Sequence, residues 1–83
     1  PVLDIRSEAE HAGGHVAGSL NIPLPKLEER IAEVPADRPV VVHCEGGYRS
    51  AIGVSLLQKL GRQHVHDLVG GFKALPVRLN LVN

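Results

Sequence analysis

The single cysteine of this 83-residue chain, Cys44, lies between an apolar run and a pair of glycines. The run 40–43 (Val-Val-Val-His) precedes it, and a helix-like segment begins shortly after Gly46-Gly47. A thiol between the end of a strand and the start of a helix faces free backbone amides and the positive end of the helix dipole. Both favour the thiolate, so we expect Cys44 to be a nucleophile with a lowered pKa.

The residues that follow the cysteine have the composition of a loop that holds an anion. Adjacent Gly46 and Gly47 let the backbone curl around one point with its N–H groups directed inward. Such amides stabilise a negative charge that develops on a bound sulfur. Arg49, in the first turn of the predicted helix, can reach back to an anionic substrate. The alternatives are an ordinary turn for the glycines and a solvated helix start for Arg49.

Composition and charge narrow the class of protein. Hydrophobic residues make up 43% of the chain and aromatic residues 2%, so Val, Leu, Ile and Ala must build the core. Nine basic and nine acidic residues, with no strongly basic stretch, make nucleic acid a poor partner. The sequence shows neither an apolar run that could span a bilayer nor a signal peptide. A functional lone thiol implies a reducing compartment, and we expect a cytoplasmic protein.

The length predicts a single domain over residues 1–83. Because the chain starts with Pro1 directly before a strand-like run, rather than with Met, we expect it to be cut from a longer protein. Strands and helices alternate along it, which indicates a parallel α/β fold. In chain order we expect a strand at 2–5, a short helix between a Ser7–Glu10 capping box and Gly13-Gly14, an extended piece at 19–22, a helix at 25–34, a strand buried on both faces at 40–43, a helix at 49–60, a strand at 64–69 and one helical turn at 72–75.

Apolar residues three and four apart predict which side of each longer helix faces the core. For the helix at 25–34 these residues are Leu24, Leu27, Ile31 and Val34. For the helix at 49–60 they are Ile52, Leu56, Leu57 and Leu60.

Five segments together resemble rhodanese-like domains. In the order seen in that family, they are Leu3-Asp4-Ile5-Arg6, Gly14-His15-Val16-Ala17-Gly18-Ser19, Asn21-Ile22-Pro23-Leu24, the Cys44 loop and Gly70-Gly71-Phe72. The resemblance covers nearly the whole chain and implies a three-layer α/β/α sandwich around a mainly parallel sheet. It also implies a sulfurtransferase, in which the active-site cysteine takes a sulfane sulfur from a donor, holds it as a persulfide and passes it to an acceptor.

The resemblance assigns roles to residues of this chain. Cys44 is the implied nucleophile, with Arg49 beside it. The residues implied to form the cradle around its sulfur are Glu45, Gly46, Gly47, Tyr48 and Ser50. Tyr48 could form the mouth of the pocket, although plain packing would explain it equally well.

Asp4 and Arg6 lie at the carboxyl end of the first predicted strand. Ligands of parallel α/β sheets bind at that edge, so both residues could line the site. The resemblance implies that they support the loop rather than take part in the chemistry. The alternative is that Asp4 caps loop amides and that Arg6 forms a surface ion pair.

Three features depart from the family pattern. The usual first strand and its helix are absent before Val2, which leaves the sheet one edge strand short. Leu75 replaces the expected Trp, and the tail 76–83 is apolar, so we expect it to dock on a missing element. The Cys-x-Gly-Gly-Tyr-Arg-Ser form of the loop resembles rhodanese domains fused to metallo-β-lactamase-type enzymes, including persulfide dioxygenases, whose partner domain would hold iron.

We expect no metal or cofactor in the chain itself. His64 and His66 share a strand face and His43 precedes the cysteine, but the spacing of a zinc site is missing.

The proposed reaction is a two-step transfer. Thiosulfate or a low-molecular-weight persulfide would load Cys44, and a thiol or cyanide would unload it. Because Glu45 offsets Arg49, we expect weak use of the thiosulfate dianion.

Two other functions stay open from the sequence. Cysteine phosphatases use a Cys-x5-Arg loop, whereas only four residues separate Cys44 from Arg49, and Glu45 would repel a phosphate dianion. A non-catalytic rhodanese-like binding or regulatory module would typically have lost the cysteine that this chain keeps.

Overall fold

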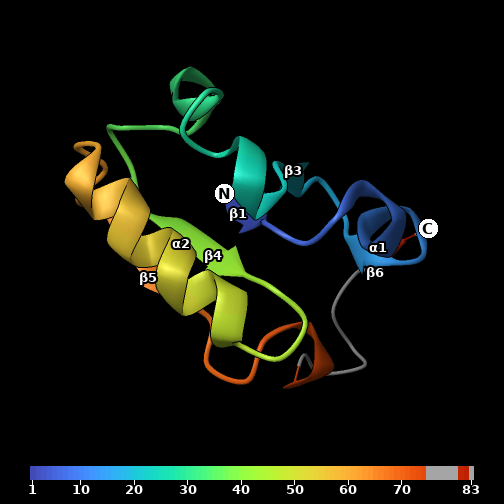
Figure 1. Cartoon of the computed structure of the whole chain (residues 1–83). Helices are drawn as coiled ribbons and strands as arrows, with labels where there is room; N and C mark the ends of the chain where they lie inside the picture. The colour runs from blue at the N-terminus through green and yellow to red at the C-terminus, as the bar shows by residue number, and fades with distance from the viewer. Residues whose placement is uncertain (75–80, 83) are drawn as a thin grey trace.

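The computed structural model describes residues 1–74 and 81–82 (Figure 1). Its elements in chain order are β1 (Val2–Asp4), α1 (Glu8–Ala12), β2 (His15–Val16), β3 (Leu20–Asn21), the 3₁₀ turns η1 (Leu24–Lys26) and η2 (Ile31–Glu33), β4 (Val40–His43), α2 (Tyr48–Lys59), β5 (Val65–Asp67), the 3₁₀ turn η3 (Phe72–Ala74) and β6 (Leu81–Val82). No helix among these residues is long and apolar enough to cross a membrane.

The central sheet has the strand order β3-β1-β4-β5, and all of its pairings are parallel. The carboxyl ends of its strands therefore meet at one edge, where Asp4 is the register partner of His43. A separate antiparallel pair joins β2 to β6. This arrangement confirms the expected α/β fold with a mostly parallel sheet.

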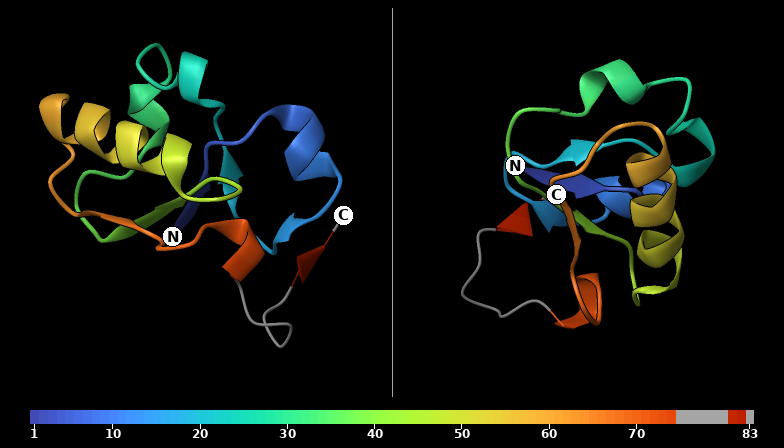
Figure 2. Two further views of the ribbon diagram at one scale, coloured as in Figure 1. Left: turned by 60° about the horizontal axis from the view of Figure 1, so that its bottom comes forward. Right: turned by 90° about the vertical axis from the view of Figure 1, so that its left-hand side faces the viewer.

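Helix α2 covers one face of this sheet (Figure 2), and α1 lies at its carboxyl edge. On the opposite face Val41 is only partly buried and its register partner His66 is exposed. The described residues thus form one helical layer of the expected sandwich and place no α-helix on that opposite face.

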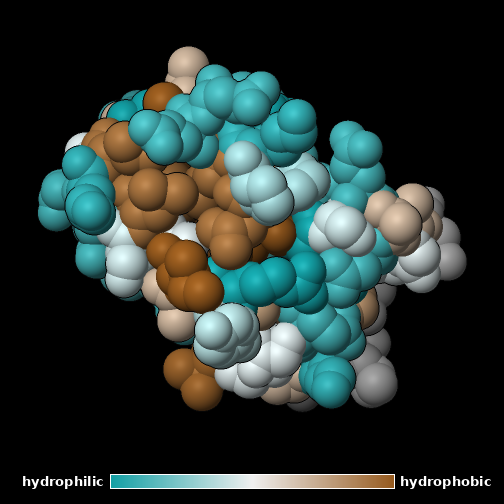
Figure 3. Space-filling view, viewed as in Figure 1, coloured by the Kyte–Doolittle hydropathy of each residue, from teal (hydrophilic) through white to brown (hydrophobic). Residues whose placement is uncertain are grey.

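The core lies between the sheet and α2. It contains Leu3 and Ile5 near β1, Val40 and Val42 of β4, Val65 of β5, Leu57 of α2, and Ile22, Leu27, Val34 and Cys44 from the connections. The expected apolar side of α2 is wrong at Ile52, which is 46% exposed. An apolar surface lies along this helix (Figure 3). The buried residues of α2 are Ser50, Gly53 and Leu57. A Cβ at Gly53 would lie 2.8 Å from Ile5 Cδ1, so the glycine allows the helix to approach the sheet closely.

The helix expected at 25–34 does not form, and the two 3₁₀ turns η1 and η2 take its place. Most backbone hydrogen bonds here span three residues, as from Val34 N–H to Ile31 O at 3.0 Å. The Arg62 side chain donates to the carbonyls of Val34 and Ile31 at 2.9 and 3.0 Å, which helps to satisfy them without a continuous helix. Leu27 and Val34 are nevertheless buried, so the apolar spacing correctly predicts burial but not the type of helix.

The capping box of α1 forms as expected. Ser7 Oγ accepts from Glu10 N–H, the Glu10 carboxylate accepts from Ser7 N–H at 2.9 Å, and the helix ends at Gly13. The single turn expected after Gly70-Gly71 is η3. Leu75 and the tail residues 76–80 and 83 lie outside the described residues. The end of the tail, Leu81–Val82, pairs with β2 of this chain, so for these two residues the expected docking on a missing element is wrong.

Candidate active site

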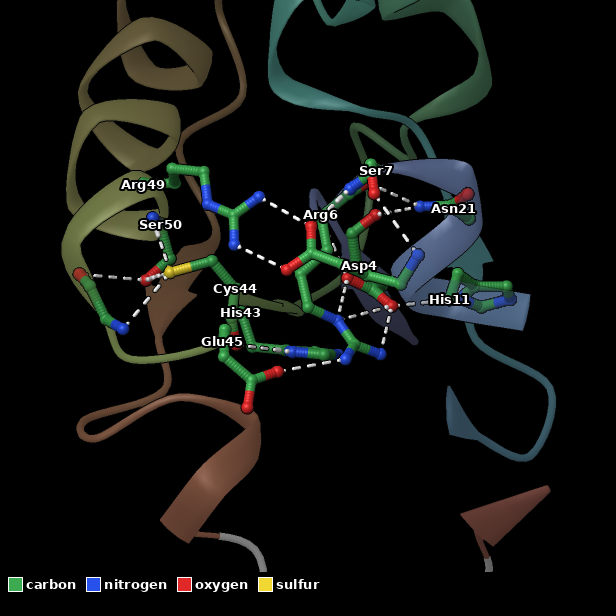
Figure 4. Close-up of polar contacts among 12 residues, drawn as sticks. Asp4, Arg6, Ser7, His11, Asn21, His43, Cys44, Glu45, Arg49 and Ser50 are labelled. Atoms are coloured by element: carbon green, nitrogen blue, oxygen red, sulfur yellow. Dashed lines mark hydrogen bonds and ion pairs between the residues drawn. The ribbon is translucent and has the colours of Figure 1, made fainter. Parts of the chain in front are cut away.

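Cys44 directly follows β4 and is buried, with 1% of its surface exposed. Its Sγ accepts hydrogen bonds from the backbone N–H groups of Gly47 at 3.1 Å and Ser50 at 3.2 Å (Figure 4). As a thiol, Cys44 also donates to Ser50 Oγ at 3.6 Å. The sulfur therefore lies under the first turn of α2, where amides that have no partner within the helix converge on it.

These contacts lower the pKa of the thiol. Burial acts to raise the pKa of Cys44, but its hydrogen bond with the Ser50 side chain and those from the amides of Ser50, Gly47 and Arg49 lower it by more. The expectation of a lowered pKa at this position is confirmed. The Cys44 thiol is therefore more readily ionised than that of an ordinary buried cysteine.

The turn after β5 is hydrogen-bonded to the backbone of the cysteine loop. Phe72 N–H donates to Cys44 O at 2.8 Å, and Lys73 N–H donates to Glu45 O at 3.1 Å. Gly71 has φ +67°, and a Cβ at this position would lie 2.5 Å from Glu45 O. Only glycine allows the two backbones to approach so closely. The sequence pointed to this segment only through the family resemblance.

Ser50 is held next to the sulfur by two further contacts. Its hydroxyl donates to Gly47 O at 3.2 Å and is hydrogen-bonded to the carboxylate of Asp67, the last residue of β5. Sequence reasoning missed Asp67. The predicted strand ran to residue 69, whereas β5 ends at Asp67. With the observed end, the rule that singled out Asp4, a polar residue at the carboxyl end of a parallel strand, also finds Asp67.

Arg49 is bound by a carboxylate that the sequence analysis did not assign to the site. Its Nη1 and Nη2 donate to Glu10 Oε1 and Oε2 at 2.8 and 2.9 Å, so α2 is joined to α1. Chiefly through the hydrogen bond from Arg49, the pKa of Glu10 falls from 4.5 to about 2. The expectation that Glu45 offsets Arg49 is therefore wrong, because Glu10 makes that ion pair. The capping box had identified Glu10, but only as a residue of the helix start.

Arg6 is the partner of Glu45 and is 3% exposed, which excludes the surface ion pair. Its Nη1 donates to Glu45 Oε1 at 3.1 Å, and its Nε and Nη2 donate to the Asp4 carboxylate at 3.0 and 2.9 Å. The guanidinium also lies 4.0 Å from the centre of the Phe72 ring. Burial acts to raise the pKa of Asp4, but hydrogen bonds from Arg6 and His11 outweigh it and lower that pKa. Asp4 and Arg6 thus tie β1 to the cysteine loop.

The other predicted loop residues differ in exposure. Gly47 has φ 102°, a left-handed conformation that glycine adopts readily, and the position of a Cβ at Gly46 is open. Tyr48 begins α2 and is 80% exposed, so it does not pack in the interior. Within residues 1–74 and 81–82, no group of three or more potential metal ligands occurs.

A family model for the rhodanese-like domain matches residues 1–75, and the chain belongs to this family. It is 37% identical over 73 residues to a sulfurtransferase of Allochromatium vinosum, covering 88% of this chain and 68% of that protein. It is 36% identical over 73 residues to the thiosulfate sulfurtransferase PspE of Escherichia coli, covering 86% of this chain and 69% of PspE. The chain is therefore related to rhodanese-type sulfurtransferases.

The share of each further relative that this chain covers ranges from about half to nearly all. YqhL of Bacillus subtilis is 39% identical over 72 residues, a match that spans 87% of this chain but only 57% of YqhL. A rhodanese-related protein from Thermoplasma volcanium superimposes with a TM-score of 0.84 at 34% identity, covering 98% of this chain and 81% of that protein. The rhodanese-like domain of the Alr3790 protein from Anabaena superimposes with a TM-score of 0.91 at 26% identity. The superposition covers 99% of this chain and 97% of that domain.

Proposed function

We propose that this chain is a sulfurtransferase that carries a sulfane sulfur on Cys44 as a persulfide. The observation that carries the proposal is the buried sulfur with two backbone N–H groups directed at it, from Gly47 and Ser50. The kinship with rhodanese-type sulfurtransferases supports the same reaction.

In the first step the Cys44 thiolate attacks the outer sulfur of thiosulfate or of a low-molecular-weight persulfide. The S–S bond of the donor breaks, and sulfite or the parent thiolate leaves with the bonding electrons. The new terminal sulfur of Cys44 carries the negative charge, and the loop amides and Arg49 stabilise it. Gly46, Tyr48 and Glu45 complete the cradle.

In the second step a thiol or cyanide attacks that terminal sulfur, and the Cys44 thiolate is regenerated. The cycle needs a reduced thiol, so we place the protein in a reducing compartment such as the cytoplasm. We also propose that a fused metallo-β-lactamase-type domain could supply or consume the persulfide.

The test is the intact mass of the reduced protein before and after exposure to thiosulfate, and separately to glutathione persulfide. A gain of one sulfur atom that cyanide or a thiol removes is expected. Because Cys44 is the only cysteine, Cys44→Ser is a clean control and should gain nothing. A Cys44→Ser protein that kept full turnover would refute the mechanism.

A folded wild-type protein that gained no sulfur from either donor would contradict the proposal, and phosphatase assays would follow. The geometry disfavours that activity, because four residues separate Cys44 from Arg49 and Glu10 already occupies Arg49. Binding to a protein partner without catalysis would be tested last.

A further inference from the structure

Both guanidinium groups at the candidate site are already paired with carboxylates. Arg6 contacts Asp4 and Glu45, and Arg49 contacts Glu10 (Figure 4). Three carboxylates thus surround two guanidiniums before any substrate binds. A site built to attract a dianion would be expected to leave at least one cation free.

The Glu10 carboxylate faces the two terminal nitrogens of the Arg49 guanidinium. The ion pair uses one N–H on each terminal nitrogen of Arg49, and the carboxylate lies 2.8 and 2.9 Å away. The pKa of Arg49 is raised, first by its hydrogen bond to Glu10 and also by the charge of Cys44. Glu10, Arg49 and the sulfur therefore influence one another electrostatically, and an anion bound at Cys44 would be repelled by the charge of Glu10.

We propose that Glu10 is a specificity-determining residue, which neutralises Arg49 so that the site prefers sulfane-sulfur donors with one negative charge over the thiosulfate dianion. This inference rests on the proposed sulfurtransferase function. The interaction free energy between a fixed charge and a donor is proportional to the charge of the donor. Removing the charge of Glu10 should therefore help a dianion twice as much, in free energy, as a monoanion.

The experiment compares two donors of nearly the same shape, thiosulfate and methanethiosulfonate, in which a methyl group replaces one charged oxygen. Glu10→Gln removes the charge and keeps the capping box, since Gln serves at this helix position as well as Glu. We expect kcat/KM to rise about threefold for methanethiosulfonate and about tenfold for thiosulfate. The ratio of the two values is the decisive quantity, because a change in the pKa of Cys44 or in folding affects both donors alike.

Two variants serve as controls. Glu28→Gln removes the same charge from an exposed position between η1 and η2. Ser7→Ala breaks the capping box and keeps the charge of Glu10. Neither should change the donor ratio, and the effect of Glu10→Gln should shrink as salt is added. An unchanged ratio in Glu10→Gln, or a ratio that moves against thiosulfate, would overturn the inference.

Equilibrium binding separates this inference from the proposed function. In a Cys44→Ser background, sulfate and methanesulfonate serve as unreactive analogues of the two donors. Glu10→Gln should bind sulfate about tenfold and methanesulfonate about threefold more tightly. If wild-type Cys44 gains no sulfur from any donor, the proposed function fails, whereas equal binding changes for both anions would reject the role of Glu10 alone.

Discussion

The Ser50 hydroxyl is the side chain that most directly controls how readily Cys44 ionises. Next to burial, which acts in the opposite direction, it has the largest effect on the pKa of Cys44 and lowers it. Ser50→Ala removes this hydrogen bond and keeps the Ser50 amide, so we expect the pKa of Cys44 to rise. Below the new pKa the rate of sulfur loading should fall, and at alkaline pH it should match the wild type. The pH dependence of thiol alkylation measures this shift.

Ser55→Ala is the matched control for this prediction, because Ser55 lies on the same helix at an exposed position. Its alkylation profile should superimpose on that of the wild type. An alkylation midpoint for Ser50→Ala at or below the wild-type value would show that the amides alone set the thiolate fraction.

At the scale of elements, the turn that leads into η3 holds the cysteine loop through the close approach of Gly71 to Glu45 and Cys44. A Cβ at Gly71 would lie 2.5 Å from Glu45 O and 2.8 Å from Cys44 O, and φ is +67°. We expect Gly71→Ala to cost about 1–2 kcal/mol for the left-handed backbone and about 1–3 kcal/mol more for the clash. Urea unfolding measures the loss, and the rate of sulfur loading should fall with it because the loop must move.

Gly61→Ala isolates the backbone part of this cost. Gly61 also has a positive φ, +92°, but a Cβ there would meet no atom within 4 Å. Gly61→Ala should therefore lose only the stability that the left-handed backbone costs, and its rate of sulfur loading should equal that of the wild type. Equal stabilities for the two variants would mean that the added Cβ at Gly71 is accommodated at little cost and that this contact does not hold the cysteine loop in place.

Elements whose signal is local could be predicted from the sequence. The capping box at Ser7–Glu10, the buried strand at Val40–His43 and the low-pKa cysteine after it each depend on neighbouring residues. The segment 25–34 was predicted wrongly because the apolar spacing of a helix is also satisfied by successive 3₁₀ turns that the distant Arg62 stabilises. The partners of Arg49 and Arg6 could not be predicted, since Glu10 and Glu45 each lie 39 residues away along the chain.

At the scale of the whole molecule, the Glu10–Arg49 ion pair links the first helix to the helix that carries the cysteine loop. Because the pKa of Glu10 falls from 4.5 to about 2 on folding, its stabilising contribution is complete above pH 4.5 and is lost as the pH falls toward 2. Glu10→Gln lacks this contribution at every pH. We therefore expect the wild type to be more stable than Glu10→Gln near neutral pH, with the difference shrinking across that window and vanishing below it.

Urea unfolding over a pH series, followed by circular dichroism, checks this prediction. Glu28→Gln removes a carboxylate from an exposed position and should follow the wild-type curve throughout. A stability difference between wild type and Glu10→Gln that stayed constant from neutral pH to pH 2 would mean that the ion pair does not hold the two helices together in solution. In the folded protein Glu10 keeps its charge until the pH approaches 2, so acid should alter the charge beside Cys44, and with it donor preference, only at the acid end of the range over which stability is lost.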